Sequence, residues 1–319
     1  MKRLGKSAIV FVAIGLLIYG GAYYAAEQLL YRNGHSNPLF KITKAGPGAF
    51  DWVILGASHA MPLDFADFND QMRRETGMKI INLASPGTGP LYNRFVLEVF
   101  LRDHSAKNLL YVVDSFAFYS RIWNEERFGD TKLLRATPFD VGIAGLLWQY
   151  SWHEGVERRA LADYLSGFSK LNNRDRFQKD IWEGELQFDR VYRPSASAVK
   201  SRISYLFPSP EAPAALTRYL AEFSKLLDLA QKQNIRVVLV KMPTPAQFRA
   251  QLPNEADFSF AMSRLLAGQG FVLKDFSADL DEPRFYFDTD HLNRTGVTEF
   301  FTRHLRQLLA SPRNREGRI

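Results

Sequence analysis

The chain has 319 residues, of which 46% are hydrophobic and 24% are charged, an ordinary composition for a globular protein. It contains no cysteine, which excludes disulfides, thiolate metal sites and a cysteine nucleophile. The formal net charge is +7, but the basic residues are scattered and no aromatic stacking motif accompanies them, so we expect no nucleic acid as a partner. A protein that handles an anionic polymer and one with no charged partner would both fit this charge.

The first informative segment is residues 7–26, which carry no charged side chain over about the length that spans a bilayer core. Lys2, Arg3 and Lys6 precede the segment, so the positive-inside rule keeps the amino terminus in the cytoplasm. The sequence therefore predicts an anchor at residues 1–29 that crosses the inner (cytoplasmic) membrane once. The lipid bilayer is then a partner, and the rest of the chain lies in the periplasm or outside the cell.

A cleavable signal peptide is the alternative for this segment, with Gly20–Ala22 as a small-residue cleavage site. The apolar stretch is long for a signal peptide, and Tyr19, Tyr23 and Tyr24 suit the aromatic belt at a membrane interface. A helix in a protein core is the third possibility. Basic residues on one side only, at the amino terminus, argue against it.

Short apolar runs after a linker at residues 30–50 predict five strands. Their expected positions are Asp51–Leu55, Lys79–Leu83, Asn108–Val113, Ile235–Met242 and Phe271–Phe276. Continuous apolar runs rich in β-branched residues, such as RVVLV, are typical of strands buried on both faces. Such strands form parallel sheets that are covered by helices.

Helical patterns lie between and after these strands, at Pro90–Arg102, Ala214–Gln233, Phe258–Gly268 and Thr295–Ala310. The predicted fold class is therefore a three-layer α/β/α domain over residues 51–310, with a mostly parallel five-stranded sheet. Residues 119–213 interrupt this alternation and are rich in Trp, Arg and Tyr. We expect a mainly helical insertion there, serving as a lid or a partner-binding cap, with a separate small domain as the alternative. Residues 311–319 are expected to be a tail.

A serine follows the first predicted strand directly, in the sequence Gly56-Ala57-Ser58-His59. This position is the carboxyl end of a buried strand, where α/β sheets bind ligands. If a helix begins there, the backbone N–H of Ser58 can also donate to an oxyanion. By itself the motif is weak evidence for a functional serine, because serine often only ends a strand or caps a helix.

An aspartate and a histidine lie three residues apart before the last predicted helix, in the sequence FDTDHLN at residues 287–293. His291 can take a proton from a serine while Asp288 fixes the tautomer of the imidazole. As the alternative, Asp288 and Asp290 are turn and cap residues and His291 is an exposed polar side chain. The two motifs together are more informative, because the first strand and the last loop meet at the carboxyl edge of this fold.

A G-x-S motif after the first strand, with D-x-x-H before the last helix, resembles the SGNH (GDSL-like) superfamily. The resemblance implies that Ser58 is the nucleophile and that Asp288 and His291 complete a catalytic triad. It also implies an oxyanion hole made by Ser58 and by Gly87, in the sequence NLASPGTG after the second strand. Gly89 is the alternative to Gly87, and both glycines are also typical of turns.

The third block of hydrolytic members, Gly-x-Asn-Asp, is missing, because the third strand ends in Val113-Asp114-Ser115-Phe116. Losing the asparagine removes a donor commonly worth about 3 kcal/mol of transition-state stabilisation. Ser115 could substitute for it in the oxyanion hole, or it could cap the following turn.

With the anchor, the pattern is similar to envelope proteins that work beside a membrane-bound O-acyltransferase, such as alginate O-acetylation proteins and the D-protein of lipoteichoic acid D-alanylation. That resemblance implies serine-dependent transfer of an acetyl or D-alanyl group to an envelope polymer acceptor, a polysaccharide or teichoic-acid-like polymer. The alternatives are a carbohydrate esterase with the same triad and a scaffold without catalysis, which would use the tryptophans of the insertion. We expect no cofactor, and since the six histidines lie singly, no metal.

Overall fold

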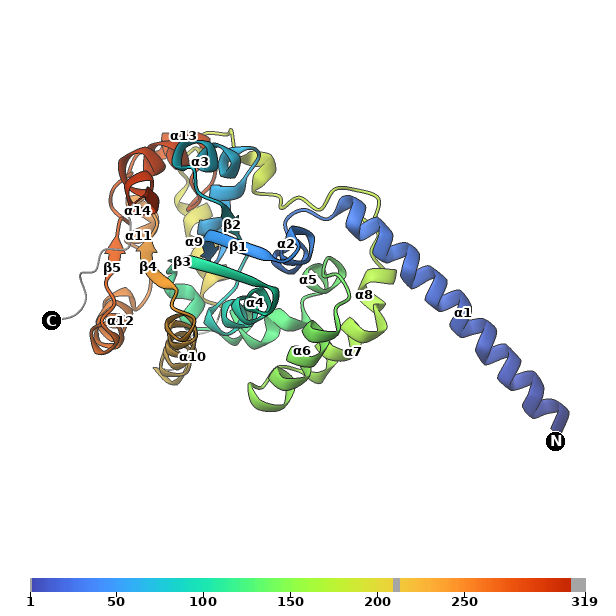
Figure 1. Cartoon of the computed structure of the whole chain (residues 1–319). Helices are drawn as coiled ribbons and strands as arrows, with labels where there is room; N and C mark the ends of the chain where they lie inside the picture. The colour runs from blue at the N-terminus through green and yellow to red at the C-terminus, as the bar shows by residue number, and fades with distance from the viewer. Residues whose placement is uncertain (1, 209–212, 311–319) are drawn as a thin grey trace. The chain divides into compact units, whose positions relative to one another are not determined.

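The computed structural model describes residues 2–208 and 213–310. The chain divides into two compact units. The helical unit consists of residues up to 44 together with 128–180, and the sheet unit consists of residues 45–127 and those from 181 onward. The expected tail at 311–319 lies outside the described residues. Figure 1 shows the elements of both units.

The sheet unit contains one parallel five-stranded sheet with the strand order β2-β1-β3-β4-β5. The strands are β1 (Gly48–Leu55), β2 (Ile80–Asn82), β3 (His104–Val112), β4 (Arg236–Lys241) and β5 (Leu273–Asp275). All five lie where the sequence predicts strands. β1 and β3 begin earlier than expected, at Gly48 and His104. These first residues of the two strands pair only with each other. That extension is partly exposed, so it lacks the apolar run by which the other strands are predicted.

Helices cover both faces of this sheet, so the fold is the predicted three-layer α/β/α. The α-helices of the unit include α3 (Phe68–Thr76), α4 (Pro90–Asp103), α9 (Ala196–Leu206), α10 (Pro213–Lys232), α11 (Ala246–Arg249), α12 (Glu255–Gln269), α13 (Arg294–Phe300) and α14 (Arg306–Ala310). Short 3-10 helices are η1 (Ser58–Asp64), η2 (Ser115–Phe118), η3 (Arg121–Trp123), η4 (Glu125–Gly129), η5 (Glu185–Gln187) and η6 (Pro283–Phe285).

Side chains alternate between the two faces of the strands, as strand geometry requires. Trp52 and Ile54 of β1 lie on the face packed against α3 and α13, in a core that includes Phe68 and Phe300. Tyr111 of β3 points the other way and packs against Phe223 of α10, with 4.8 Å between ring centroids. Burial on both faces explains why β1, β3 and β4 read as continuous apolar runs.

Two expected segments differ in their secondary structure. Residues 30–50 form no irregular linker, because α1 (Lys2–Asn33) continues into them and is followed by α2 (Pro38–Ala45) and the start of β1. Leu30, Leu39, Phe40 and Ile42 are buried there, so this segment is part of the folded protein. The last helix is expected to be continuous, but a π-helical turn at Phe301–Leu305 separates α13 from α14.

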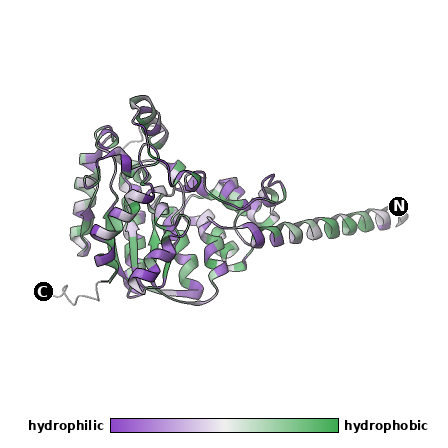
Figure 2. Ribbon diagram, turned by 90° about the horizontal axis from the view of Figure 1, so that it is seen from above, coloured by the Kyte–Doolittle hydropathy of each residue, from purple (hydrophilic) through white to green (hydrophobic). Residues whose placement is uncertain are grey.

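The helical unit contains α1 and α2 with α5 (Thr131–Arg135), α6 (Val141–His153), α7 (Arg158–Ser166) and α8 (Phe168–Leu171). The expected insertion is mainly helical, but the two units share it, since residues 128–180 belong to the helical unit. Residues 5–33 of α1 are long and apolar enough to cross a membrane. Figure 2 shows mostly hydrophobic colour along the extended part of this helix. Membrane anchors and signal sequences share this length and composition.

Gly56, between β1 and Ser58, is a position that only glycine fits. Its φ of +143° is one that residues with side chains rarely adopt, and an added Cβ would lie 2.8 Å from the carbonyl oxygen of Val112. We therefore expect Gly56→Ala to lower the free energy of unfolding by about 3 kcal/mol, from backbone strain plus the clash. Thermal or denaturant unfolding of the purified chain measures this.

Gly77 provides the matched control. It also has a positive φ, +69°, but no atom lies within 4 Å of the place that an added Cβ would take. Gly77→Ala should cost only the strain of the left-handed backbone, about 1–2 kcal/mol. Equal losses in the two variants would show that the contact with Val112 is not what excludes a side chain at Gly56.

Candidate active site

Ser58 lies at the carboxyl end of β1, where it begins the 3-10 helix η1. The loop after β2 holds this turn in place, because Thr88 Oγ1 donates to the carbonyl oxygen of Gly56 at 3.0 Å. Asn82 Nδ2 donates to the carbonyl oxygen of Ala60 at 2.8 Å, which fixes the first turn of η1. The position of the serine therefore depends on two neighbouring strands and not on its own turn alone.

His291 lies in a tight loop between η6 and α13. The loop is closed by an antiparallel bridge between Tyr286 and Leu292, and the N–H of Phe287 donates to the carbonyl oxygen of His291. Asn293 ends the loop as the N-cap of α13, where its side-chain oxygen accepts from the N–H of Gly296 at 2.9 Å. This capped and bridged loop leaves the imidazole little freedom.

The structure brings Ser58, His291 and Asp288 into one hydrogen-bonded line. Ser58 Oγ lies 2.8 Å from His291 Nε2, and His291 Nδ1 lies 2.8 Å from Asp288 Oδ2. A carboxylate only accepts, so Nδ1 carries the proton and Nε2 accepts from the serine hydroxyl. Asp288 Oδ1 also accepts from the N–H groups of Asp290 and His291, at 3.1 and 2.8 Å, which fixes the carboxylate. The arrangement fits a general base directed at a nucleophile.

The neighbouring carboxylate, Asp290, belongs to a separate buried ion network. It is fully buried and accepts from Arg202 Nε at 2.9 and 3.1 Å and from Thr289 Oγ1 at 2.6 Å. His59 Nε2 lies 3.2 Å from it, and His59 Nδ1 lies 2.5 Å from Asp114 Oδ1. The network therefore connects the ends of β1 and β3, the helix α9 and the loop of His291.

The charges in this network stabilise one another. Burial alone lowers the pKa of His59, but Asp114 and Asp290 raise it to about 10, so His59 is a cation at neutral pH. Burial raises the pKa of Asp290, yet its electrostatic interactions with His291, Arg202 and His59 hold it well below the usual range. Asp290 is thus a carboxylate whose bonds are already taken by other partners. Asp288 is the one that contacts the imidazole Nδ1 at hydrogen-bond distance.

Gly87 and Ser115 lie in the segments that follow β2 and β3, at the same edge of the sheet as Ser58. Gly87 belongs to the loop bonded to Gly56, and its φ is +58° with Trp123 2.6 Å from where a Cβ would lie, so it has no room for a side chain. Ser115 follows Asp114, the partner of His59, and is buried. Their part in an oxyanion hole stays a prediction. Gly89, the alternative to Gly87, donates its N–H to the carbonyl oxygen of Trp123.

Three side chains come close enough together to be considered as metal ligands, His59, Asp290 and His291. The guanidinium of Arg202 pairs with the same carboxylate, and its Nη2 lies 3.4 Å from His291 Nε2. A metal ion there would meet this positive charge and would have to displace the ion pairs. The donor set therefore fits a network of ion pairs better than a metal centre.

The side chains of Ser58 and His291 are almost completely buried. Ser58 is 3% exposed and His291 is 1% exposed. The imidazole packs against the rings of Phe287 and Trp182, with centroid distances of 5.5 and 5.3 Å, and Arg202 of α9 lies beside Nε2. Little of Ser58 and His291 is therefore in contact with water.

Sequence reasoning missed the roles of His59, Asp114, Arg202 and Trp182. A signal existed for the first two, because each stands at the carboxyl end of a strand, beside Ser58 or in the place of the missing third block. No local signal marks Arg202 or Trp182, since both come from the insertion, where strand alternation gives no guide. Their proximity to His291 depends on how the whole unit packs.

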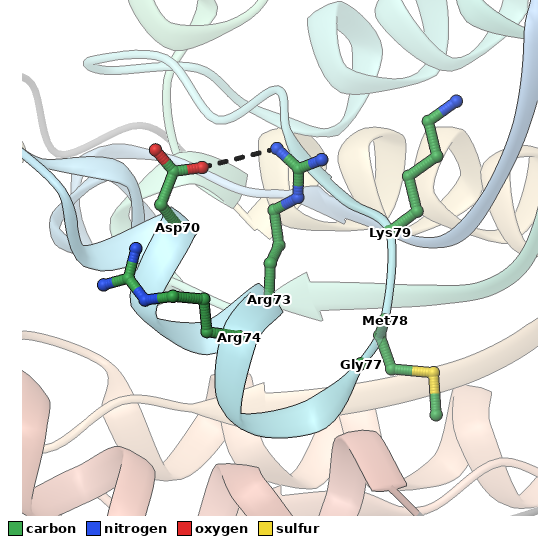
Figure 3. A pocket seen from close by; sticks show the side chains of 6 residues that line it. All are labelled: Asp70, Arg73, Arg74, Gly77, Met78 and Lys79. Atoms are coloured by element: carbon green, nitrogen blue, oxygen red, sulfur yellow. Dashed lines mark hydrogen bonds and ion pairs between the residues drawn. The ribbon is translucent and has the colours of Figure 1, made fainter.

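A separate hollow of about 540 Å³ lies at the opposite edge of the sheet, between the end of α3 and the start of β2 (Figure 3). Arg73, Arg74 and Lys79 line it together with Asp70, which pairs with Arg73 at 3.4 Å. Strands in a parallel sheet all run the same way, so this hollow lies at their amino ends, whereas Ser58 lies at a carboxyl end. It takes no part in the chemistry of Ser58.

No protein-family model matches the chain, and no curated protein matches it significantly. Among solved structures, one match is the crystal structure of a protein from Bacteroides fragilis NCTC 9343 described as a "putative acylhydrolase". The identity is 9% and the TM-score is 0.37, over 81% of this chain and 85% of that chain. A likeness of this degree identifies neither family nor chemistry, so the side chains around Ser58 are what indicate an activity.

The charge of His59 makes a prediction about stability and pH. Its folded pKa of about 10 exceeds its ordinary value of 6.5, so its contribution is complete below about pH 6.5 and is lost as the pH rises toward about 10. We expect the melting temperature of the wild type to exceed that of His59→Gln by an amount that shrinks over this range. A difference that stays constant would show that His59 is not charged between Asp114 and Asp290.

The two aspartates of the D-x-D-H sequence should separate in unfolding experiments. Asp290→Ala leaves His59 and Arg202 as buried cations without their shared partner, and should cost about 3–5 kcal/mol. The side chain of Asp288 is 36% exposed, so Asp288→Ala should cost about 1 kcal/mol, the net value of an ordinary hydrogen bond. Denaturant titration of both variants measures the difference, and equal losses would contradict this division.

Proposed function

We propose that the chain is a serine-dependent acyltransferase of the SGNH type, with Ser58 as nucleophile, His291 as general base and Asp288 as the group that orients it. The observation that carries this proposal is the hydrogen-bonded line from Ser58 Oγ through His291 to Asp288, with 2.8 Å at each step. Nucleophile and base within hydrogen-bond reach, with the base oriented by a carboxylate, is the arrangement that activates a serine.

The reaction has two halves. His291 Nε2 takes the proton of Ser58 Oγ while the oxygen attacks the carbonyl carbon of an acyl donor, and the imidazolium then gives that proton to the departing group. In the second half, an acceptor hydroxyl loses its proton to Nε2 and attacks the acyl-serine, and Ser58 leaves with the proton. Asp288 stabilises the imidazolium in both halves. The N–H of Ser58, with Gly87 and Ser115, would receive the negative charge of each tetrahedral intermediate.

We propose transfer to a hydroxyl rather than hydrolysis, and the burial of Ser58 and His291 supports this choice. An acyl-serine survives until an acceptor arrives only where water is kept out, and Ser58 is 3% exposed. An esterase with the same triad would give the acyl group to water instead. The acceptor that we propose is a hydroxyl of an envelope polymer, a polysaccharide or teichoic-acid-like chain, with an acetyl or D-alanyl group supplied through a membrane-bound O-acyltransferase.

The place of action that we propose is based on α1. We propose that this helix stays in the inner membrane with its amino terminus in the cytoplasm, since Lys2, Arg3 and Lys6 precede the apolar stretch. The sheet unit then works in the periplasm or outside the cell. A membrane-anchored enzyme is well placed to take an acyl group from a membrane-bound partner.

Ser58→Ala is the direct test of the nucleophile. Incubation of the wild type with an activated ester such as 4-nitrophenyl acetate should give an acyl adduct on Ser58, detected by intact mass and peptide mapping. Ser58→Ala should show no adduct. It should also lower the transfer rate at least about a thousandfold, and His291→Ala nearly as much, because triad members act as a unit.

Ser85→Ala is the matched control. Ser85 also follows a strand at this edge of the sheet and is 2% exposed, but it is not part of the line from Ser58 to Asp288. This variant should keep both the adduct and the transfer rate. A scaffold without catalysis predicts the opposite pattern, with normal polymer acylation in a strain that carries Ser58→Ala, and that result would end the catalytic proposal.

A further inference from the structure

The helix α1 has an uncovered part and a covered part. Every residue from 5 to 22 is exposed, and at 1.5 Å per residue this stretch is about 27 Å long, close to the roughly 30 Å of a bilayer core. From Tyr23 onward one face is covered, with Ala26 and Leu30 buried against the rest of the helical unit. The length of α1 that no other part of the helical unit covers is therefore close to the length that a bilayer core would surround.

Polar contacts fasten the covered part to its unit. The carboxylate of Glu27 pairs with Lys170, which is 5% exposed, and also accepts from the N–H of Phe139 at 2.8 Å. Farther along, Asn33 Nδ2 donates to the carbonyl oxygen of Arg176 at 2.7 Å. Because α1 is one continuous helix, these contacts hold its uncovered part in a set direction relative to the helical unit.

The corner between α7 and α8 touches α1 where the uncovered part ends. Tyr19 Oη donates to the carbonyl oxygen of Ser166 at 2.6 Å, and Tyr23 packs so closely on Gly167 that a Cβ there would lie 2.1 Å from its ring. Two large apolar side chains flank this corner and face solvent, Leu165 at 51% and Phe168 at 63% exposed. They lie at the level where a bilayer around α1 would have its surface.

Helix α6 adds an apolar face to the same unit. Val141, Trp148 and Trp152 are 76%, 57% and 53% exposed, and their spacing places them on one side of the helix, opposite the buried Ile143 and Leu147. Helix α6 packs against α7, the helix that leads into this corner (Figure 1). Exposed tryptophans beside a membrane-spanning helix are typical of the interface region of a bilayer.

We propose that the helical unit rests on the outer surface of the membrane that α1 spans, with Leu165 and Phe168 of the α7–α8 corner and the Trp148–Trp152 face of α6 inserted into the lipid interface. The lipid surface is the occupant that fits, because the corner contacts the membrane helix itself and its apolar side chains continue the apolar surface of that helix. The guanidinium of Arg158, 4.1 Å from the ring of Trp152, places a positive charge near lipid phosphates. The unit thus holds α1 in a fixed direction.

The absence of cysteine allows a direct test on the full chain in phosphatidylcholine nanodiscs. A spin label on Phe168→Cys or Leu165→Cys should be more accessible to oxygen, which dissolves in lipid, than to a water-soluble nickel chelate. The matched control is Val272→Cys in the sheet unit, an apolar position that is 76% exposed and should show the reverse. Labels at 165 and 168 as open to the nickel chelate as the label at 272 would overturn the proposal.

Tryptophan fluorescence tests α6 separately. The chain has five tryptophans, and Trp148 and Trp152 are the two on this helix. Nanodiscs with bromine on the lipid acyl chains should quench part of the emission of the wild type, and a Trp148→Phe, Trp152→Phe variant should lose that quenchable part. Equal emission of the wild type with and without bromine would overturn the lipid contact of α6, and a partner protein would then be the occupant of that face. Neither readout depends on Ser58, so both stand apart from the acyl-transfer proposal.

Discussion

A carboxylate with no exposure to water, Asp290, shares its charge with a guanidinium and an imidazolium that reach it from different parts of the chain. Buried charges are costly unless they are paired and hydrogen-bonded, and here each charged side chain contacts at least one of opposite charge. His59 comes from the turn after β1, Arg202 from α9, and Asp114, the second partner of His59, from the end of β3. Removing any one of them takes a charged partner from at least one of the others, so the segments around Ser58 are held as a set.

This network positions Ser58 and His291 relative to each other. It binds His59, which is next to Ser58, and Asp290, which is next to His291, so the distance between Ser58 and His291 depends on it. Asp288 remains free to orient the imidazole because Asp290 is occupied elsewhere. The two carboxylates of this short loop therefore differ in role. Asp288 is partly exposed and contacts Nδ1 of His291, whereas Asp290 is buried among cations and holds the network together.

The sequence was enough to predict the sheet, because strands buried on both faces must read as apolar runs and five such runs are present. It was also enough to predict that Ser58 meets His291, since strand ends in a parallel sheet share one edge. It was not enough for residues 30–50, where the glycines and prolines that suggested a linker stand beside the buried Leu39 and Phe40. Arg202 and Trp182 were out of reach as well, because their contacts with His291 arise from tertiary packing that leaves no periodic pattern.

The separation of Ser58 and His291 by 233 positions has a consequence for the order in which the protein is made. Ser58 and β1 leave the ribosome early, but His291 arrives only after β4, β5 and the loop that follows them. Contacts of such large sequence separation form late, because they close the longest loops. A chain that is only partly made therefore carries Ser58 without His291. Under the function proposed above, acyl chemistry would then be confined to molecules whose sheet is complete.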